Sequence, residues 1–439
     1  MSFVDLVYSI IWVLLGLFVV VLVMVLFGRD FLASFPAFDP FFQTLFLFAP
    51  LWAPILLGAF FFKQWMRYIR ADFVRQAGSV LLEVKIPKET MKSPLAMEIF
   101  FTSLYQTGSA TFSELYWKGK VRPWFSFELV SIGGQVKFFI WAHKKWKNLI
   151  ETQIYAQYPT VEIYEAEDYM SWIPHEPDPI NFPMWATYFK LTKEDIYPIK
   201  TYVDYGLDKD PKEEFKIDPM TSVLEYLGSL RKGEQAWIHI MIQAHRKMNL
   251  KNDAVLFEKP DWKHEVRHEI EKIRKESITE NPGSEFPGMP NPTKGQQNII
   301  SALERSVSKF PFEVAIRGCY IAKKEAFNPI SITGLIGSFR QYSSTDDVNG
   351  FKLGWFTDFD YPWQDFRRIR RTNSEKEMME AMKLRSFFQP PFKNFEGSPI
   401  ILNTEELATI FHFPGSVAAT PTFERIPSKR SQAPSNLPI

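Results

Sequence analysis

Residues 124–142 read WFSFELVSIGGQVKFFIWA and predict a β-hairpin. The runs Trp124–Ser131 and Gln135–Ala142 are rich in aromatic and β-branched side chains, which is typical of strands. Gly133 and Gly134 lie between them, and paired glycines supply the positive φ values that a tight hairpin turn requires. This hairpin is therefore the expected centre of the first folded region.

One strand and one helix are expected on each side of the hairpin. Upstream, Ser79–Pro87 reads as a buried strand and Pro94–Gln106 as a helix. Downstream, Trp146–Tyr158 reads as a helix, and residues 160–166 read as a last strand. The order βαββαβ predicts a ferredoxin-like domain at 77–172, in which two helices cover one face of an antiparallel sheet.

A second series of the same order follows a proline-rich linker that we expect at 173–196. Its domain, at 197–372, is interrupted at 246–310 by charged sequence that predicts an inserted helical hairpin. The expected elements, in order, are a strand at 199–205, a helix at 219–230, strands at 235–243 and 312–322, a helix at 330–343 and a strand at 351–358. Residues 373–439 are expected to form a C-terminal helix and an extended connector tail.

Two uncharged apolar runs, Leu6–Phe27 and Phe42–Phe62, precede these domains. A helix over the first run rises by roughly 33 Å, which is enough to cross a hydrocarbon core of about 30 Å. Basic residues follow the second run, so the positive-inside rule places both ends of the pair in the cytoplasm. The sequence thus predicts a transmembrane hairpin at 1–76, with spans at about 6–27 and 42–62. The bulk of the chain would be cytoplasmic.

Two other interpretations of the apolar runs remain open. The first run could be a cleaved signal peptide, although Asp5 precedes it and the run is longer than such peptides need. Pro50 and Pro54 could make the second run a re-entrant segment, although spanning helices tolerate proline. A re-entrant second run would place the bulk of the chain outside the cell.

Composition excludes several classes of function. Lysine and arginine total 51 against 50 acidic residues, so the overall charge neither attracts nor repels nucleic acid. Cys319 is the only cysteine, which excludes a disulfide framework and a cysteine metal cluster. The chain contains no phosphate-loop motif and no G-x-G-x-x-G motif. We therefore expect a non-enzymatic protein that binds no nucleotide or other cofactor.

His264, Glu265 and His268 spell H-E-x-x-H, in which two histidines one helical turn apart hold zinc and the glutamate polarises water. A membrane-tethered zinc metalloprotease is therefore an alternative function. Zinc-protease helices lie in the protein interior, whereas this helix carries charges beside the motif: Lys263, Arg267, Glu269, Glu271 and Lys272. A charged surface helix is the favoured interpretation.

Two basic clusters are candidates for contact with the phosphates of nucleic acid or anionic lipid. They are Lys144, Lys145 and Lys147 in HKKWK, and Arg367, Arg368, Arg370 and Arg371 in FRRIRR. Acidic residues before the second cluster partly cancel its charge. Solvated surface charge is the favoured interpretation, and a nucleic-acid-binding module stays open as an alternative function.

Three stretches of the chain resemble the membrane-anchored, non-motor N-terminal region of type IV secretion and conjugation-like ATPases of the HerA and FtsK kind. They are LLEVKIPKETMKSPLAME from Leu81, IETQIYAQYPTVEI from Ile150 and ILNTEELATIFHFPG from Ile401. In that family, the stretch matched by Pro434–Pro438 leads into a motor domain with a phosphate loop. The resemblance implies that the motor is a separate polypeptide, or that this sequence is part of a longer one.

The resemblance, taken with the missing phosphate loop, predicts a non-catalytic subunit of a translocation machine that docks a separate phosphate-loop ATPase. It also implies that the predicted hairpin lies in a bacterial inner membrane. The expected docking residues lie in the connector tail: Asn403, Glu405, Phe411 and Phe413. The expected partners are this ATPase, the lipid bilayer and, as a candidate, DNA, and the chain is expected to form homo-oligomers. The expected fold class is α+β, with a two-helix transmembrane hairpin before two ferredoxin-like domains, the second carrying a helical-hairpin insertion.

Overall fold

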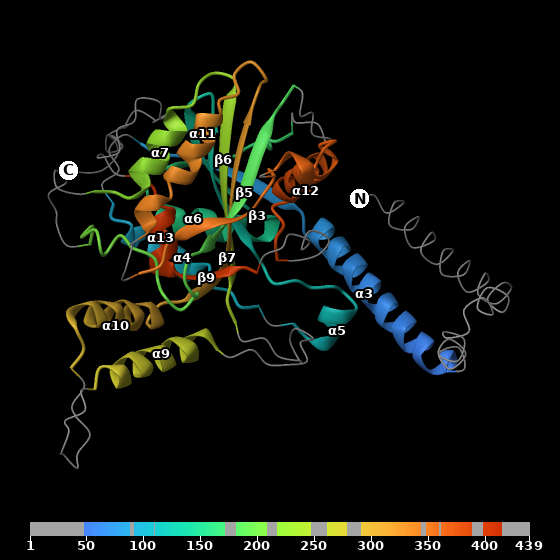
Figure 1. Ribbon diagram of the computed structural model, residues 1–439, viewed down its shortest axis with the longest axis horizontal. Coiled ribbons are helices and arrows are strands. Elements are labelled where there is room, and N and C mark those ends of the chain that lie inside the picture. Colours follow the sequence, from blue (N-terminus) through green and yellow to red (C-terminus); the bar gives the residue numbers. More distant parts are fainter. Residues whose placement is uncertain are drawn as a thin grey trace, which may run out of the picture. The chain divides into compact units, whose positions relative to one another are not determined.

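One antiparallel sheet of nine strands organises the part of the chain that the structure describes (Figure 1). The computed structural model describes residues 48–87, 92–108, 110–171, 181–208, 217–246, 261–278, 291–343, 348–359, 361–388 and 398–414. The strands are β1 (Ser79–Lys85), β2 (Phe125–Ile132), β3 (Gln135–His143), β4 (Glu162–Glu165), β5 (Met184–Leu191), β6 (Glu234–Ala244), β7 (Pro311–Ala322), β8 (Phe351–Phe356) and β9 (Ile400–Asn403). The main row has the order β4-β1-β3-β2-β6-β7-β5-β8, and β9 pairs with β7. The fold class is therefore α+β.

The hairpin expected from the sequence forms β2 and β3. Ile132 pairs with Gln135, so Gly133 and Gly134 form the turn, with φ values of 60° and 88°. A side chain at Gly134 would also collide with the backbone, since its Cβ would lie 2.6 Å from the Leu230 carbonyl oxygen. With β1 and β4, the hairpin gives the first half of the sheet the order β4-β1-β3-β2. Helices α4 (Leu95–Ser103) and α6 (Lys147–Gln157) lie in its two connections.

The second half repeats this arrangement in the order β8-β5-β7-β6. Helices α7 (Met220–Gly228) and α11 (Pro329–Gly337) lie in its connections, and α9 (Trp262–Glu276) and α10 (Lys294–Val307) are inserted between β6 and β7. Its first strand is β5, not the strand that we expected at 199–205. β5 lies within the segment expected to be a proline-rich linker. The prolines of that segment end at Pro183, so they precede a strand directly.

The two halves are joined edge to edge. β2 and β6 pair antiparallel from Phe125 opposite Ile242 to Ile132 opposite Gln235. Each of these strands would be an exposed edge of its own half, with a row of unpaired backbone N–H and C=O groups. Their pairing satisfies these groups and makes a single sheet, whereas the sequence suggested two separate sheets.

Apolar side chains cover both faces of this sheet, because alternate residues of a strand point to opposite faces. On β6, Ile238 and Ile240 join the larger apolar cluster, which also contains residues of α4, α6, α7 and α11. Trp237 joins the second cluster, which Met378 and Met382 of α12 (Ile369–Lys383) complete. Figure 1 shows α12 on the side of the sheet opposite to α7 and α11.

Residues 400–413 also belong to the core, although the sequence predicted an extended connector there. β9 pairs with Pro311–Val314 of β7 and leads into α13 (Thr404–Ile410). The Phe411 ring lies 5.1 Å from the Phe127 ring, between centroids, and the Phe413 ring lies 5.0 Å from that of Tyr158. The C-terminal segment thus completes the larger apolar cluster.

The predicted transmembrane hairpin is contradicted. Among the described residues, no helix combines the length and the apolar character that crossing a membrane requires. Helix α3 (Ala49–Ala77) contains most of the second predicted span but continues through Lys63 and Arg67. Its apolar part, up to Phe62, rises by only about 21 Å. The expected inner-membrane location is contradicted by the same finding. Residues 6–27, the first predicted span, lie outside the described residues.

The chain divides into two units, Met1–Tyr68 and Ile69–Ile439. The sheet and all helices after α3 belong to the second unit. A short helix, α5 (Phe112–Tyr116), precedes β2, and α3 enters the second unit with its last residues. The candidate sites described below all lie within this unit.

Phe411→Ala tests whether the C-terminal segment is part of the core. Removing a buried phenylalanine leaves a cavity, so we expect the free energy of unfolding to fall by about 3–5 kcal/mol. Urea unfolding followed by circular dichroism measures the change. Phe366→Ala is the control, because Phe366 is 83% exposed and its loss should change stability by no more than about 0.5 kcal/mol. Equal stability of the two variants would contradict the buried position of Phe411.

Candidate functional site

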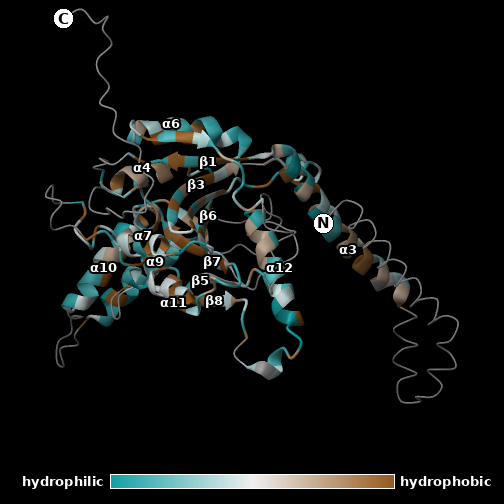
Figure 2. Cartoon of the chain, turned by 90° about the horizontal axis from the view of Figure 1, so that it is seen from above, coloured by the Kyte–Doolittle hydropathy of each residue, from teal (hydrophilic) through white to brown (hydrophobic). Residues whose placement is uncertain are grey.

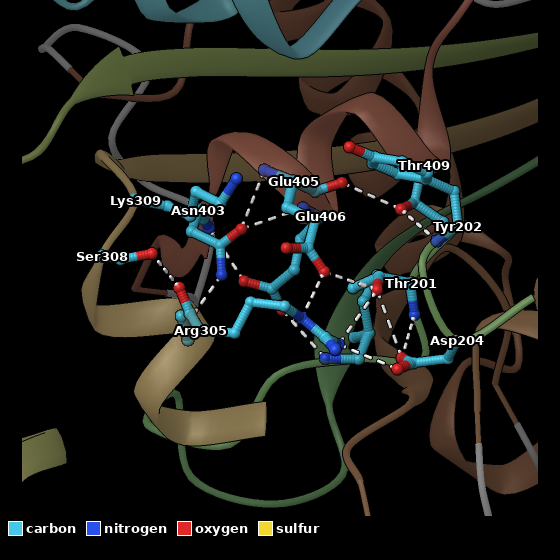
Figure 3. A network of polar contacts seen from close by, with 12 residues as sticks. Thr201, Tyr202, Asp204, Arg305, Ser308, Lys309, Asn403, Glu405, Glu406 and Thr409 are labelled. Atoms are coloured by element: carbon cyan, nitrogen blue, oxygen red, sulfur yellow. Dashed lines mark hydrogen bonds and ion pairs between the residues drawn. The ribbon is translucent and has the colours of Figure 1, made fainter. Parts of the chain in front are cut away.

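A network of polar side chains surrounds the N-terminal end of α13 (Figure 3). Asn403 caps this helix, because its Oδ1 accepts hydrogen bonds from the backbone N–H groups of Glu405 and Glu406, at 2.9 and 3.0 Å. In return, the Glu406 side chain accepts a hydrogen bond from the Asn403 N–H at 2.8 Å. This reciprocal arrangement is a capping box, which fixes where a helix begins. Asn403 also donates to Ser306 of α10 at 2.8 Å.

Glu405 links α13 to two other segments of the chain. Its Oε1 accepts a hydrogen bond from the Thr201 hydroxyl at 2.6 Å and pairs with Nε of Arg305, from α10, at 2.9 Å. Arg305 also donates to Asp204 at 2.8 Å. Figure 3 shows Arg305 between the acidic residues of the two neighbouring segments. The network therefore fastens the inserted helical hairpin to the C-terminal segment.

Glu406 is buried inside this network. Its Oε1 accepts a hydrogen bond from the Ile199 N–H at 2.9 Å, in addition to the one from Asn403 at its other oxygen. Burial raises the pKa of Glu406 to about 8, by more than these hydrogen bonds lower it. A perturbed carboxyl can mark a catalytic site. Both oxygens are engaged by backbone groups in the interior, however, and this geometry holds two chain segments together.

The four residues expected to dock a partner all lie in the interior. Asn403, Glu405, Phe411 and Phe413 are each at most 2% exposed. The first two bond within the network, and the two phenylalanines pack in the larger apolar cluster. The structure therefore places these residues in the core and leaves none of them on a surface that a partner could contact.

A second ionic cluster lies at the junction between the halves, on the opposite face of the sheet. Glu128 of β2 and His239 of β6 are paired in register. Arg385, which follows α12, donates from Nε and Nη2 to the two Glu128 carboxylate oxygens at 2.9 and 3.2 Å, and it also pairs with Asp168. Tyr169 donates its hydroxyl hydrogen to Glu128 at 2.8 Å. The cluster ties the C-terminal end of α12 to the junction.

Burial and charge fix the protonation states in this junction cluster. Burial alone would raise the pKa of Glu128, but the charge of Arg385 lowers it to about 2. Burial lowers the pKa of His239 to about 4, although Glu128 opposes this shift. Because Tyr169 gives its hydrogen to Glu128, its oxygen accepts the hydrogen bond from His239 Nε2, across 2.5 Å. At neutral pH the cluster thus holds an ionised Glu128 and a neutral His239, both fully buried.

The H-E-x-x-H residues lie on the outer side of α9. His264, Glu265 and His268 are exposed, while Trp262 and Val266 pack into the apolar cluster between α9 and α10. The described ranges of the chain contain no group of three side chains placed to bind a metal ion. The position of the motif is that of a charged surface helix.

The HKKWK cluster lies on the surface at the end of β3. Lys144 and Lys145 are exposed, and Lys147 pairs with Glu165 at 2.5 Å. Lys147 is therefore neutralised by an acidic residue of the same chain. Lys144 and Lys145 are exposed and form no salt bridge with the described residues.

The FRRIRR cluster lies at the start of α12. Arg371 is engaged internally, with Asp358 and Glu375 each at 2.9 Å. The other three arginines, Arg367, Arg368 and Arg370, are exposed. Of the acidic residues before the cluster, Asp358 pairs with Arg371, and Asp360 lies outside the described residues.

An aromatic group beside this cluster was not predicted from the sequence. Four large apolar side chains between β8 and the first turn of α12 are more than half exposed: Tyr361, Trp363, Phe366 and Ile369. Their signal is the run of aromatic residues directly before the arginines in YPWQDFRRIRR. From the sequence, only the arginines of this stretch were predicted to form a site.

Comparison with known proteins gives one family. The model of a family described as a domain of unknown function (DUF8128) matches residues 70–425. The matched residues include every strand of the sheet, the inserted helical hairpin and both ionic clusters. A search for similar curated proteins found no match.

Arg385→Met tests the junction cluster. Removing one partner leaves Glu128 buried without its compensating charge, so we expect a loss of about 3–5 kcal/mol in the free energy of unfolding. Adding Glu128→Gln should recover part of this loss, because the buried charge is then gone. Arg274→Ala is the control, since its ion pair with Glu304 is half exposed and should contribute less than about 1 kcal/mol. Urea unfolding of the wild type, the two single variants and the double variant measures these changes. Similar losses for Arg385→Met and Arg274→Ala would contradict the stabilising role of the junction cluster.

His239 makes stability depend on pH. Its pKa in the folded protein is lowered to about 4, so between pH 6.5 and 4 the unfolded chain binds a proton that the folded chain does not. The stability that neutral His239 confers is present above pH 6.5 and is lost as the pH falls toward 4, by on the order of 3 kcal/mol. His239→Gln keeps a donor toward Tyr169 without this titration, so its stability should fall less steeply. Urea unfolding at several pH values measures both curves, and parallel curves would show that His239 is not held neutral.

Proposed function

The chain belongs to the DUF8128 family, and for it we propose the function of a non-catalytic platform that docks a separate phosphate-loop ATPase. The resemblance to the non-motor region of HerA- and FtsK-like ATPases supports this proposal. The residues that carry it lie in β1 and α4, in α6 and β4, and in β9 and α13. These elements build the larger core, so the resemblance concerns the fold and leaves open which surface meets the ATPase.

The inserted helical hairpin is the observation that carries the proposal. α9 and α10 pack on an apolar cluster of their own, which contains Trp262, Val266, Ile270 and Leu303. Figure 1 shows both helices beyond the end of the sheet, beside β9. An element with its own small core and a long exposed face is suited to reach a partner.

Polar contacts hold this hairpin firmly at its base. Trp262 donates from Nε1 to the Asp195 carbonyl oxygen at 3.1 Å, and the Tyr197 hydroxyl donates to Glu269 at 2.9 Å. Arg305 attaches α10 to the network around α13, as described above. A rigidly mounted arm loses little conformational freedom on binding, which favours affinity.

The exposed face of α9 carries both signs of charge, among them Arg267, Glu271 and Lys275. Mixed charge of this kind fits a protein surface of complementary pattern better than a uniformly anionic ligand. In this function the H-E-x-x-H residues contribute to a contact surface and need no metal.

Charge reversal on α9 tests the proposal. A purified ATPase of the HerA or FtsK kind from the same genome is titrated against the immobilised full chain in an interferometry assay. Arg267→Glu combined with Lys275→Glu should weaken binding at least about tenfold, because like charges are brought together. Arg231→Glu with Lys232→Glu, on an exposed turn before β6, is the matched control and should bind as the wild type does. Absence of wild-type binding would contradict the platform function, and equal binding of both variants would contradict the α9 surface.

A further inference from the structure

The segment between β8 and α12 projects from the body of the protein, whereas α12 itself is well anchored. Glu375, Met378, Met379 and Met382 of α12 are buried, and the three methionines pack on the second face of the sheet. Figure 2 shows the chain that leads into α12 extending away from the sheet. Residues 361–370 of this segment are here called the aromatic–arginine segment. Its last residues form the first turn of α12, and the later turns of this helix are buried.

The apolar side chains of this segment do not fold back into a core. Phe366 is 83% exposed and Trp363 is 63% exposed. The rings of Tyr361 and Trp363 stack on one another, with centroids 4.5 Å apart and planes inclined by 13°. Ile369 adds an exposed aliphatic side chain on the first turn of α12. Adjacent exposed apolar side chains are typical of a binding surface.

The charge that this segment presents to solvent is positive. Asp358 and Glu375 pair with Arg371, and Asp365 accepts a hydrogen bond from the Arg371 N–H at 2.8 Å. These acids are therefore engaged at the base of the segment. The side chains of Arg367 and Arg368 form no hydrogen bond or ion pair within the described ranges. Asp360 lies outside those ranges.

Arg370 shows the kind of contact that this segment offers. Its guanidinium lies 5.2 Å from the centre of the Phe359 ring, and it donates to the Gln364 carbonyl oxygen. A guanidinium held against an aromatic ring can still bind an anion with its remaining N–H groups. The segment thus places three aromatic side chains, at 361, 363 and 366, directly before three arginines, at 367, 368 and 370.

We propose that the aromatic–arginine segment binds single-stranded nucleic acid. Unpaired bases stack on aromatic side chains, and arginines bind the phosphates between them. A single strand supplies base faces and anions side by side, which matches exposed rings and arginines that adjoin one another on one segment. A duplex keeps its bases stacked inside, and an acidic protein surface has no flat faces for the rings. This inference does not depend on the docking of an ATPase.

The test uses the full chain and a fluorescein-labelled oligothymidylate, with fluorescence anisotropy as the readout at low and rising salt. Trp363→Ala and Phe366→Ala should each weaken binding at least about fivefold, because each removes a stacking partner. Arg367→Ala with Arg368→Ala should weaken binding and reduce the slope of log K against log salt by about 1.4. All four side chains are exposed, so thermal unfolding of these variants should match that of the wild type.

Matched controls use similar side chains elsewhere. Trp117→Ala removes a tryptophan that is 69% exposed, and Arg231→Ala with Lys232→Ala removes two adjacent exposed cations. Both should leave oligonucleotide binding unchanged. The proposal is overturned if the wild type does not bind at low salt, or if the controls weaken binding as much as the segment variants. It is also overturned if a duplex binds as tightly as the single strand, or if polyglutamate displaces the oligonucleotide at equal charge, which would indicate an acidic protein partner.

Discussion

The pairing of β2 with β6 is the constraint on which the rest of the structure depends. It turns two four-stranded arrangements into one sheet, and it places both strands where neither face nor edge meets solvent. Side chains on these strands can then find partners only within the chain. The apolar residues achieve this by packing. Glu128 and His239 cannot, so a charge from another segment has to reach them, and Arg385 supplies it.

The C-terminal third of the chain meets this requirement on both faces of the sheet. α12 and Arg385 cover the polar junction on one face, while β9 and α13 complete the apolar cluster on the other. The two ionic clusters are similar in design, since in each a buried carboxyl group accepts hydrogen bonds from a segment distant in the sequence. Glu128 and Glu406 each have both carboxyl oxygens hydrogen-bonded, and a buried charge left without its partner would cost several kcal/mol. Burial and charge inside these clusters account for the strongly shifted pKa values of Glu128, His239 and Glu406.

Local patterns in the sequence predicted local structure well. The glycine pair in the 124–142 stretch predicted the turn between β2 and β3, and the βαββαβ order of the first region agrees with the strand order β4-β1-β3-β2. Prediction failed where a contact between distant segments decides the outcome. Nothing in β2 or β6 alone indicates that the two edges pair. The segment around Asn403 looks polar and rich in carboxylates, and only Arg305 and the Ile199 backbone explain how it can be buried.

Two further failures have a different physical cause. The prolines at 174–183 suggested a linker, but proline, which has no backbone N–H to donate, weakens only a strand that contains it, so the residues after Pro183 are free to form β5. The apolar run ending at Phe62 suggested a membrane span. In the structure, α3 continues beyond Phe62 without a break, and its second half contains charged residues. Of the candidate site residues, the exposed arginines were found from sequence. The aromatic side chains beside them were not, because exposure cannot be read from residue type.

The position of Phe411 against Phe127 and Phe138 has a consequence for biosynthesis. These contacts join the first half of the sheet to residues that leave the ribosome almost three hundred positions later. Until then, part of the surface of β2 and β3 that Phe411 and Phe413 cover lacks its native partners. Contacts of such long range are slow to form and expose apolar surface in the meantime. The nascent protein therefore exposes an apolar surface that its finished structure covers.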